Sequence, residues 1–198
     1  PALQRAAFVK AHDTSDFEGT HERQFDHHLL HQVTYDTLLK AERRLGHAAA
    51  ARWLAERTRG RGSEFVAMTG EHAERAGETA LAIDCFDQAA REASKRFANP
   101  AAAAWLRRAL ELLGPTDPLR RFDLLRRLQV IADAVGDRAG QDAALQEMGE
   151  LLQRHPDEPR QAQLLLSLSM LTERRGDLPA AEQHARRSLE LAERREVV

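Results

Sequence analysis

The sequence has few of the residues that build β-sheets. Its 198 residues include 7 Val and 2 Ile, against 34 Ala and 27 Leu. Because Ala and Leu favour helices while β-branched residues favour strands, this composition disfavours a sheet-dominated fold. Aromatic residues are also scarce, at 5%, while 30% of residues are charged. The balance indicates many small amphipathic helices.

Cysteine and long apolar runs are lacking as well. A single cysteine, Cys85, cannot form an internal disulfide. The longest apolar run, Leu164 to Leu171, is eight residues long and contains two serines, whereas crossing a bilayer takes about 20 residues. The first residues, PALQRAAFVKAH, lack the pattern of a signal peptide. We therefore expect no membrane span and a reducing, cytoplasmic setting.

Neither sign of charge is in clear excess. The chain has 29 basic and 31 acidic residues, a formal net charge of -2, so no overall basic footprint for nucleic acid or anionic lipid is present. One alternative is nucleic-acid binding through six arginines: Arg107, Arg108, Arg120, Arg121, Arg126 and Arg127. Interleaved acids and the lack of nearby stacking aromatics lead us to expect no nucleic-acid partner.

What is present is a succession of helix patterns after a short β-hairpin. Two runs, 7–12 and 22–27, flank the loop-forming segment DTSDFEGTH and predict the hairpin. The following pattern predicts helices at 28–39, 41–57, 64–76, 79–97, 100–113, 118–135, 138–154, 159–175 and 178–195.

Turn residues mark the predicted helix ends. Ser63, and Asn99 and Asp117 before prolines, are placed to cap helix starts. Gly77, Gly136 and Gly176 stand where a helix ends in the left-handed conformation, and Asp137 and Asp177 then cap the next helix. Three helical hairpins are therefore expected.

Small residues recur around two of these glycines. The residues seven before, five after and twelve after the glycine are Gly70, Ala82 and Ala89 in one case, and Ser169, Ala181 and Ser188 in the other. Small residues let two helices approach closely. Around Gly136 the same offsets give Gln129, Gln141 and Met148, and a register with Ala132 and Ala144 fits better.

On this spacing, residues 63–96 and 162–195 resemble tetratricopeptide repeats, which are 34 residues long with small residues at these positions. The resemblance implies an all-α fold: a right-handed superhelix of tetratricopeptide-like helical hairpins with a short N-terminal β-hairpin.

A second resemblance covers Gln24 to Glu56, QFDHHLLHQVTYDTLLKAERRLGHAAAARWLAE. This segment is similar to one in bacterial STAND-class signalling ATPases, often fused to cyclase, kinase or helix-turn-helix output domains, where a winged helix precedes helical repeats. The matching residues are Phe25, His27, Leu29, Val33, Tyr35, Leu38, Leu39, Arg43, Arg44, His47, Ala51 and Leu54. Asp26 and Gln32 depart from the family pattern, which has a basic and an acidic residue there.

The STAND resemblance implies three parts and a role for one histidine. Residues 1–27 would be the remnant of a winged-helix domain, 28–62 a two-helix linker and 63–198 the repeat array. His27 matches a winged-helix histidine that approaches the nucleotide β-phosphate in related switch proteins. The alternative is that His27 only caps or packs at the junction between strand and helix.

The histidines also raise a metal alternative. His27 and His31 are four residues apart and His28 is adjacent, as in a stand-alone metal-dependent enzyme. The HExxH motif and a nearby third ligand are absent, so we expect no metal. The chain has no GxxxxGK[ST], and GRGS at 60–63 lacks the lysine, so we expect no cofactor and no enzymatic activity. Cys85, in an alanine-rich helix, is expected to be a core residue.

The first helix of each tetratricopeptide hairpin lines a concave groove. In this register, the groove residues are Ala67, Glu71 and Glu74 in the first unit and Leu166, Met170 and Glu173 in the last. These residues suit a basic or amphipathic protein or peptide partner. The hypothesis is a non-enzymatic protein-interaction and sensor segment of a STAND-type signalling ATPase, with the ATPase and winged-helix domain upstream in the same chain.

Overall fold

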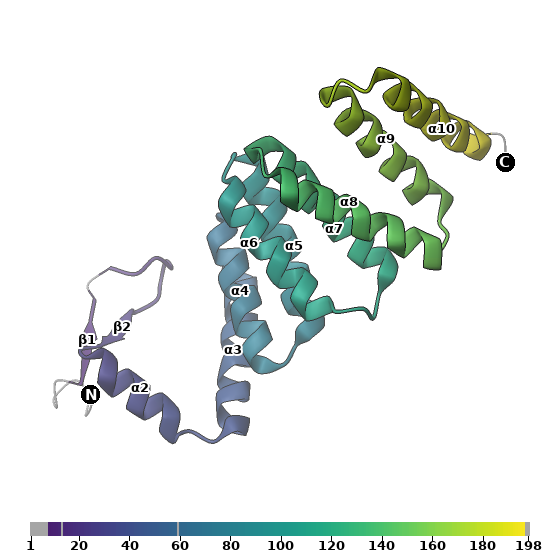
Figure 1. Cartoon of the computed structure of the whole chain (residues 1–198). Helices are drawn as coiled ribbons and strands as arrows, with labels where there is room; N and C mark the ends of the chain where they lie inside the picture. Colours follow the sequence, from purple (N-terminus) through teal and green to yellow (C-terminus); the bar gives the residue numbers. More distant parts are fainter. Residues whose placement is uncertain (1–7, 13, 59, 197–198) are drawn as a thin grey trace. The chain divides into compact units, whose positions relative to one another are not determined.

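The computed structural model describes residues 8–12, 14–58 and 60–196 (Figure 1). The elements in chain order are β1 (Val9–Ala11), β2 (Arg23–Phe25), α2 (His28–Thr37), α3 (Lys40–Arg57), α4 (Ser63–Ala76), α5 (Thr79–Lys95), α6 (Asn99–Leu113), α7 (Pro118–Val135), α8 (Arg138–Arg154), α9 (Glu158–Arg174) and α10 (Leu178–Glu196). The strands form an antiparallel pair with Val9 opposite Phe25.

The fold is therefore all-α, with tetratricopeptide-like helical hairpins and a short N-terminal β-hairpin, as predicted. Each helix begins and ends within two residues of its predicted limits. The amphipathic pattern was sufficient for this accuracy because Ala and Leu leave little competition from strand propensity.

Most predicted helix ends are confirmed. Gly77, Gly136 and Gly176 have φ of 84°, 77° and 81°, the left-handed conformation that only glycine adopts without strain. The carboxylate of Asp117 accepts a hydrogen bond from the backbone N–H of Arg120 at 2.9 Å, and Asp137 does the same for Gly140 at 2.9 Å. These aspartates cap α7 and α8.

Two predicted caps are wrong. Ser63 is the first residue of α4, buried, and the N-cap is Gly62 with no side-chain cap. Asn99 is likewise inside α6, and the N-cap is Ala98. The Asn99 prediction is wrong because of how α5 ends. Phe97 has a φ of 60°, and the N–H of Ala98 donates to the carbonyl of Ala93. This turn ends α5, and α6 therefore starts one residue earlier than predicted.

The helices and strands group into two compact units, 1–78 and 79–198. In the first unit α3 packs against α4. The loop between the strands packs against both helices through Phe17. Its ring centroid lies 4.6 Å from that of Trp53 on α3 and 5.5 Å from that of Phe65 on α4. The division at residues 27 and 62 stays a prediction.

The second unit consists of three antiparallel helix pairs, α5–α6, α7–α8 and α9–α10, and α6 also packs on α7 (Figure 1). The repeat predicted over 63–96 spans the boundary between the two units and stays a prediction. Within the units, α4 packs against α3 and α5 packs against α6.

The α9–α10 pair explains the small residues of its repeat. The hydroxyl of Ser169 donates to the carbonyl of Ala181 at 2.9 Å, and that of Ser188 donates to the carbonyl of Ala162 at 2.8 Å. A side chain can reach the partner backbone at this length only where the helices lie close together. The predicted packing role of these positions is confirmed.

The core of the second unit lies between the helix pairs. Its largest fully buried side chains are Phe122, Leu106, Leu124 and Met148. The middle pair buries the larger residues Gln129, Gln141 and Met148 and also Ala132 and Ala144, so both registers considered for it point inward. Cys85 is buried, as predicted, and burial raises the pKa of its thiol.

No helix in the part of the chain that the structure describes is long and apolar enough to cross a membrane.

Candidate functional site

The predicted groove residues fall into two sets, one in each unit. On α4, Ala67 is 3% exposed, so its methyl group is not available to a partner. Glu71 is exposed, and Glu74 is half-buried and engaged in a contact of its own. The α4 set therefore offers a partner only the carboxylate of Glu71.

The α9 set is the more open of the two. Leu166 and Met170 are 53% and 49% exposed, and Glu173 is exposed as well. The spacing of four and three residues places the three side chains on one face of α9. Leu164 and Leu171 point to the core instead, at 4% and 5% exposure. We call Leu166, Met170 and Glu173 the α9 patch.

Polar side chains fix α9 against α7. The guanidinium of Arg160 donates two hydrogen bonds to the carboxylate of Asp123, at 3.1 and 2.8 Å. Further along, the amide of Gln129 donates to the hydroxyl of Ser167 at 3.3 Å. Since these bonds lie along the length of both helices, α7 and α9 run side by side, and polar contacts help to set the position of the α9 patch.

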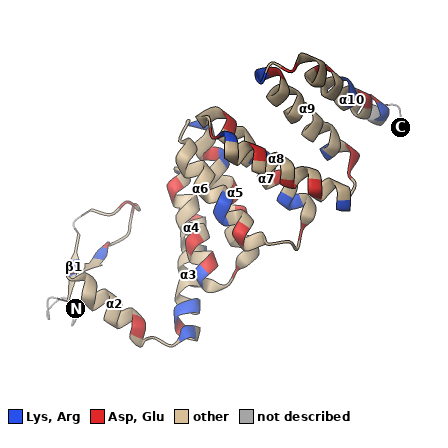
Figure 2. Cartoon of the chain, viewed as in Figure 1, with Lys and Arg blue, Asp and Glu red and all other residues tan. Residues whose placement is uncertain are grey.

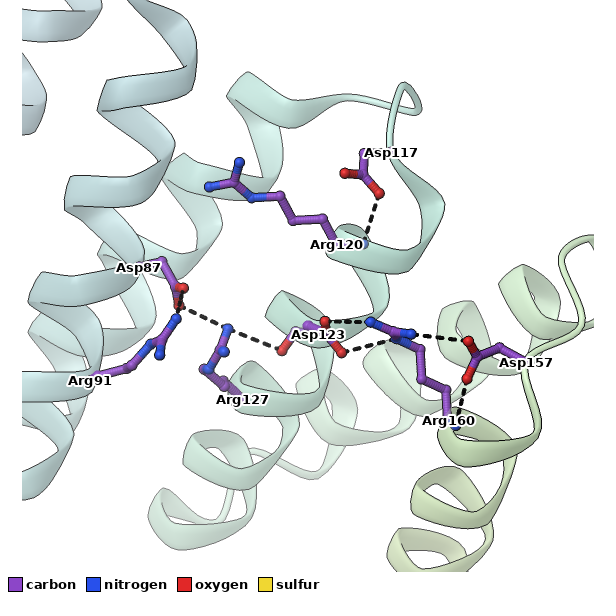
Figure 3. Close-up of polar contacts among 8 residues, drawn as sticks. All are labelled: Asp87, Arg91, Asp117, Arg120, Asp123, Arg127, Asp157 and Arg160. Carbon is purple, nitrogen blue, oxygen red and sulfur yellow. Dashed lines mark hydrogen bonds and ion pairs between the residues drawn. The ribbon is translucent and has the colours of Figure 1, made fainter. Parts of the chain in front are cut away.

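Similar polar contacts connect α7 to α5 (Figure 3). We call the series formed by Asp87, Arg127, Asp123 and Arg160 the Asp and Arg ladder. Asp87, which is 8% exposed, accepts hydrogen bonds from Arg91 on its own helix and from Arg127 on α7, the latter at 2.9 Å. The hydrogen bond with Asp87 raises the pKa of Arg91, whereas burial lowers that of Arg127. Alternating Asp and Arg thus connect the first helices of all three pairs.

The arginines considered for nucleic acid are largely neutralised. Carboxylates lie within ion-pair distance of five of them: Arg107 with Asp137, Arg108 with Glu111, Arg120 with Asp84, Arg121 with Glu147 and Arg127 with Asp87. These residues do not present an uninterrupted basic surface of the kind that a phosphate backbone needs.

The environment of His27 is acidic. Its side chain is 72% exposed, and its Nε2 lies 3.7 Å from the carboxylate of Asp26. It is the N-cap residue of α2 but makes no side-chain capping bond. Asp26 also pairs with Lys10, and the hydrogen bond from Lys10 lowers the pKa of Asp26. The role of His27 toward a nucleotide stays a prediction.

The histidine group proposed for a metal, His27, His28 and His31, does not converge on one point. The rings of His28 and His31 lie 6.3 Å apart, and His31 instead packs near Phe25 at 5.3 Å. Among the described residues, no three His, Cys, Asp or Glu side chains are grouped to hold a metal ion. The alternative of a metal-dependent enzyme has no ligand set in this part of the chain.

A different histidine pair does meet. The hydroxyl of Tyr35 on α2 lies 2.8 Å from Nε2 of His47 on α3, and Nδ1 of His47 lies 2.9 Å from Nδ1 of His72 on α4. One of the two facing nitrogens must carry a proton and the other must not. Burial is the main cause that lowers the pKa of both imidazoles, with the charge of Arg75 acting in the same direction.

The contacts among Tyr35, His47 and His72 predict that the stability of the first unit depends on pH. An imidazole whose pKa is lower when folded than when unfolded favours unfolding as it becomes protonated, so stability is full above the ordinary histidine pKa of about 6.5 and falls as the pH drops through the folded value. Thermal unfolding followed from pH 8 to pH 5 should show this loss, and His47→Gln with His72→Gln should flatten it. An unchanged slope in the double variant would contradict the interpretation.

The second unit also contains a groove of about 650 Å³, which is lined by the end of α6, the start of α7 and the second half of α8. Arg121 lines this groove, donates to the carbonyls of Leu110 and Gly114 at 3.2 and 3.1 Å, and pairs with Glu147. Arg154 and His155 lie at its rim. No sequence pattern indicates this groove, because its residues come from three separate helices and the segments between them.

Comparisons with known proteins identify no family. No family model and no curated protein matches this chain. Among solved structures, BtubC (BKLC) from P. vanneervenii aligns with 14% identity and a TM-score of 0.49, covering 68% of this chain and 64% of BtubC. MamA aligns with 17% identity and a TM-score of 0.45, covering 82% of this chain and 99% of MamA. The helices and their pairing define the fold without these matches.

Proposed function

We propose that this chain is a non-enzymatic protein-interaction segment of a multidomain bacterial STAND-type signalling ATPase, acting in the cytoplasm. The observation that carries the interaction role is the α9 patch, in which Leu166 and Met170 expose about half of their surface on one helix face. Exposed apolar side chains beside a carboxylate suit an amphipathic partner segment that carries basic residues.

The first unit supports the proposed connection to an upstream domain. Helix α2 has no buried residue, and it exposes Leu29 and Val33 at 74% and 62%. A two-stranded sheet and one such helix are too small to bury a core of their own. We propose that the remainder of a winged-helix domain covers this face, and that an ATPase domain precedes it.

The mechanism follows from linkage. A partner bound at the α9 patch can shift the two-state equilibrium of the attached switch only by its difference in affinity for the two states. The Asp and Arg ladder from α5 to α9 would make the second unit respond as one body, because moving one helix breaks ion pairs on the next.

Capture of a partner tests the interaction role. The chain is immobilised and exposed to a lysate of the cells that encode it, and bound proteins are identified and titrated. We expect Leu166→Asp with Met170→Asp to weaken a specific partner by about tenfold or more, since apolar anchors dominate such interfaces. Leu189→Asp, on α10 and 58% exposed, is the matched control and should change binding by less than about twofold.

Equal binding by the wild type and the α9 double variant, with both shown to be folded by circular dichroism, would contradict the interaction role. The STAND context has a separate test, which is the reading frame upstream of this sequence. We expect it to encode a GxxxxGK[ST] motif followed by a winged helix. A reading frame without them would leave the interaction role intact and remove the ATPase context.

A further inference from the structure

The first unit contains a small cavity with an entirely cationic set of charged residues. Its volume is about 310 Å³, and it is lined by Tyr35, Lys40, Arg43, Arg44 and Arg75. The residues come from the end of α2, the first turns of α3 and the last turn of α4. Figure 2 shows the basic residues gathered at the start of α3. Four positive charges share this space, and none of its lining residues is acidic.

These cations have few partners within the chain. The one ion pair among them in the described ranges joins Arg43 to Asp36 at 3.8 Å, and the Asp36 side chain is 62% exposed. Lys40, Arg44 and Arg75 make no hydrogen bond or ion pair with a described residue. Nε of Arg43 is buried and has no hydrogen-bond partner. Like charges this close repel one another unless an anion lies between them.

Local packing holds two of the guanidinium groups in place. The guanidinium of Arg43 lies over the ring of Tyr35, 5.1 Å from its centroid. Arg44 reaches the turn after α4, where its Cζ would lie 3.2 Å from a β-carbon built on Gly77. Any side chain at Gly77 would therefore displace Arg44. The absence of a side chain at this turn brings Arg44 toward the end of α4, where Arg75 lies.

Capping of α4 does not account for Arg44. The carbonyls of Ala73 and Glu74, at the end of the helix, already accept hydrogen bonds from the N–H groups of Gly77 and Glu78. In the described part of the chain Arg44 donates no hydrogen bond to a carbonyl of α4, so its position adds a positive charge there without capping the helix. Arginine forks and a lysine around one cavity are the donor set that binds phosphate groups.

We propose that this cavity binds a small ligand through a multiply charged phosphate group, as in a pyrophosphate or a phosphate ester. Arg43 and Arg44 supply bidentate donors, and Lys40 and Arg75 supply further positive charge. The volume suits a small molecule. Binding would also tie α2 to the α3–α4 pair, because Tyr35 lines the cavity and contacts His47 of α3.

The test uses pyrophosphate as the probe, titrated by calorimetry into the whole chain at about 0.15 M NaCl, where surface attraction is largely screened. We expect saturable one-to-one binding and a rise in the melting temperature with ligand concentration. Sulfate at the same ionic strength is the comparison anion. Arg44→Gln with Arg75→Gln should weaken binding by about tenfold or more, through loss of charge-assisted hydrogen bonds.

Arg52→Gln is the matched control, because Arg52 is an exposed arginine of α3 that does not line the cavity. We expect it to change affinity by less than about twofold. Should the double variant fail to fold, Lys40→Gln, at the exposed first residue of α3, replaces it and should also weaken binding. Lack of saturable pyrophosphate binding, or an equal loss in Arg52→Gln, would overturn the proposal. Binding of generic duplex DNA instead, lost in the cavity variants, would assign the cavity to a nucleic-acid backbone and also overturn it.

Discussion

Replacing Phe122 by alanine should lower the free energy of unfolding of the second unit by about 3–5 kcal/mol, the usual cost of removing a buried aromatic ring. Phe122 is 0% exposed and lies on α7, which packs against both α6 and α8. A cavity at this position would therefore loosen two helix–helix contacts at once. Urea unfolding in a Trp53→Phe background, followed by the fluorescence of Trp105, reports on this unit.

The matched control for this substitution is Phe97→Ala. Phe97 is 86% exposed, so the same change in side chain removes almost no buried surface. Its φ of 60° is equally strained for alanine, and the backbone cost therefore stays the same. We expect a change within about 0.5 kcal/mol. Equal effects of the two substitutions would contradict the position of Phe122 in the core.

The Asp and Arg ladder should have the second largest effect. Asp87→Asn removes the charge that faces Arg91 and Arg127, and the guanidinium of Arg127 would then be left partly buried with a weaker acceptor. We expect a loss of about 2–3 kcal/mol, because breaking a buried pair leaves an uncompensated charge. The same fluorescence measurement determines it.

Asp142→Asn is the corresponding control. Asp142 pairs with Arg175 at 2.6 Å, but the two side chains are 49% and 52% exposed. Exposed pairs contribute little, so we expect a loss below about 1 kcal/mol. If both substitutions cost the same, the ladder would be an ordinary surface charge pattern and would not connect the helix pairs.

The helices could be predicted from the sequence because the information for them is local. Glycine at a left-handed turn and aspartate before a helix act within a few residues, and Gly136 with Asp137 shows both. The end of α5 was harder to place, because the left-handed residue there is Phe97, for which sequence offers no signal. Asn99 was consequently assigned a cap that Ala98 provides.

Which helices pair could be predicted only in part. The small residues of 162–195 identified the α9–α10 pair correctly, because they lie where its helices approach each other. The packing of α3 against α4 and of α5 against α6 had no comparable small-residue signal. Propensity and spacing do not decide between two neighbours that both present an apolar face.

The polar clusters could not be predicted from the sequence, because their residues are far apart along the chain. Arg160 and Asp123 are 37 positions apart, and His47 and His72 are 25 apart. No spacing rule links such residues, and each by itself reads as a solvated charge or a surface histidine. Arg44 and Arg75 likewise become a candidate site only when the turn at Gly77 brings them to one cavity.

Hydrogen exchange of the chain with and without its captured partner tests the proposed interaction role most directly. We predict slower exchange over residues 163–174, which carry the α9 patch, and little change over α10, which packs on the other side of the same pair. Unchanged exchange in α9, or protection of α10 to the same extent, would show that the partner binds elsewhere and would contradict the proposal.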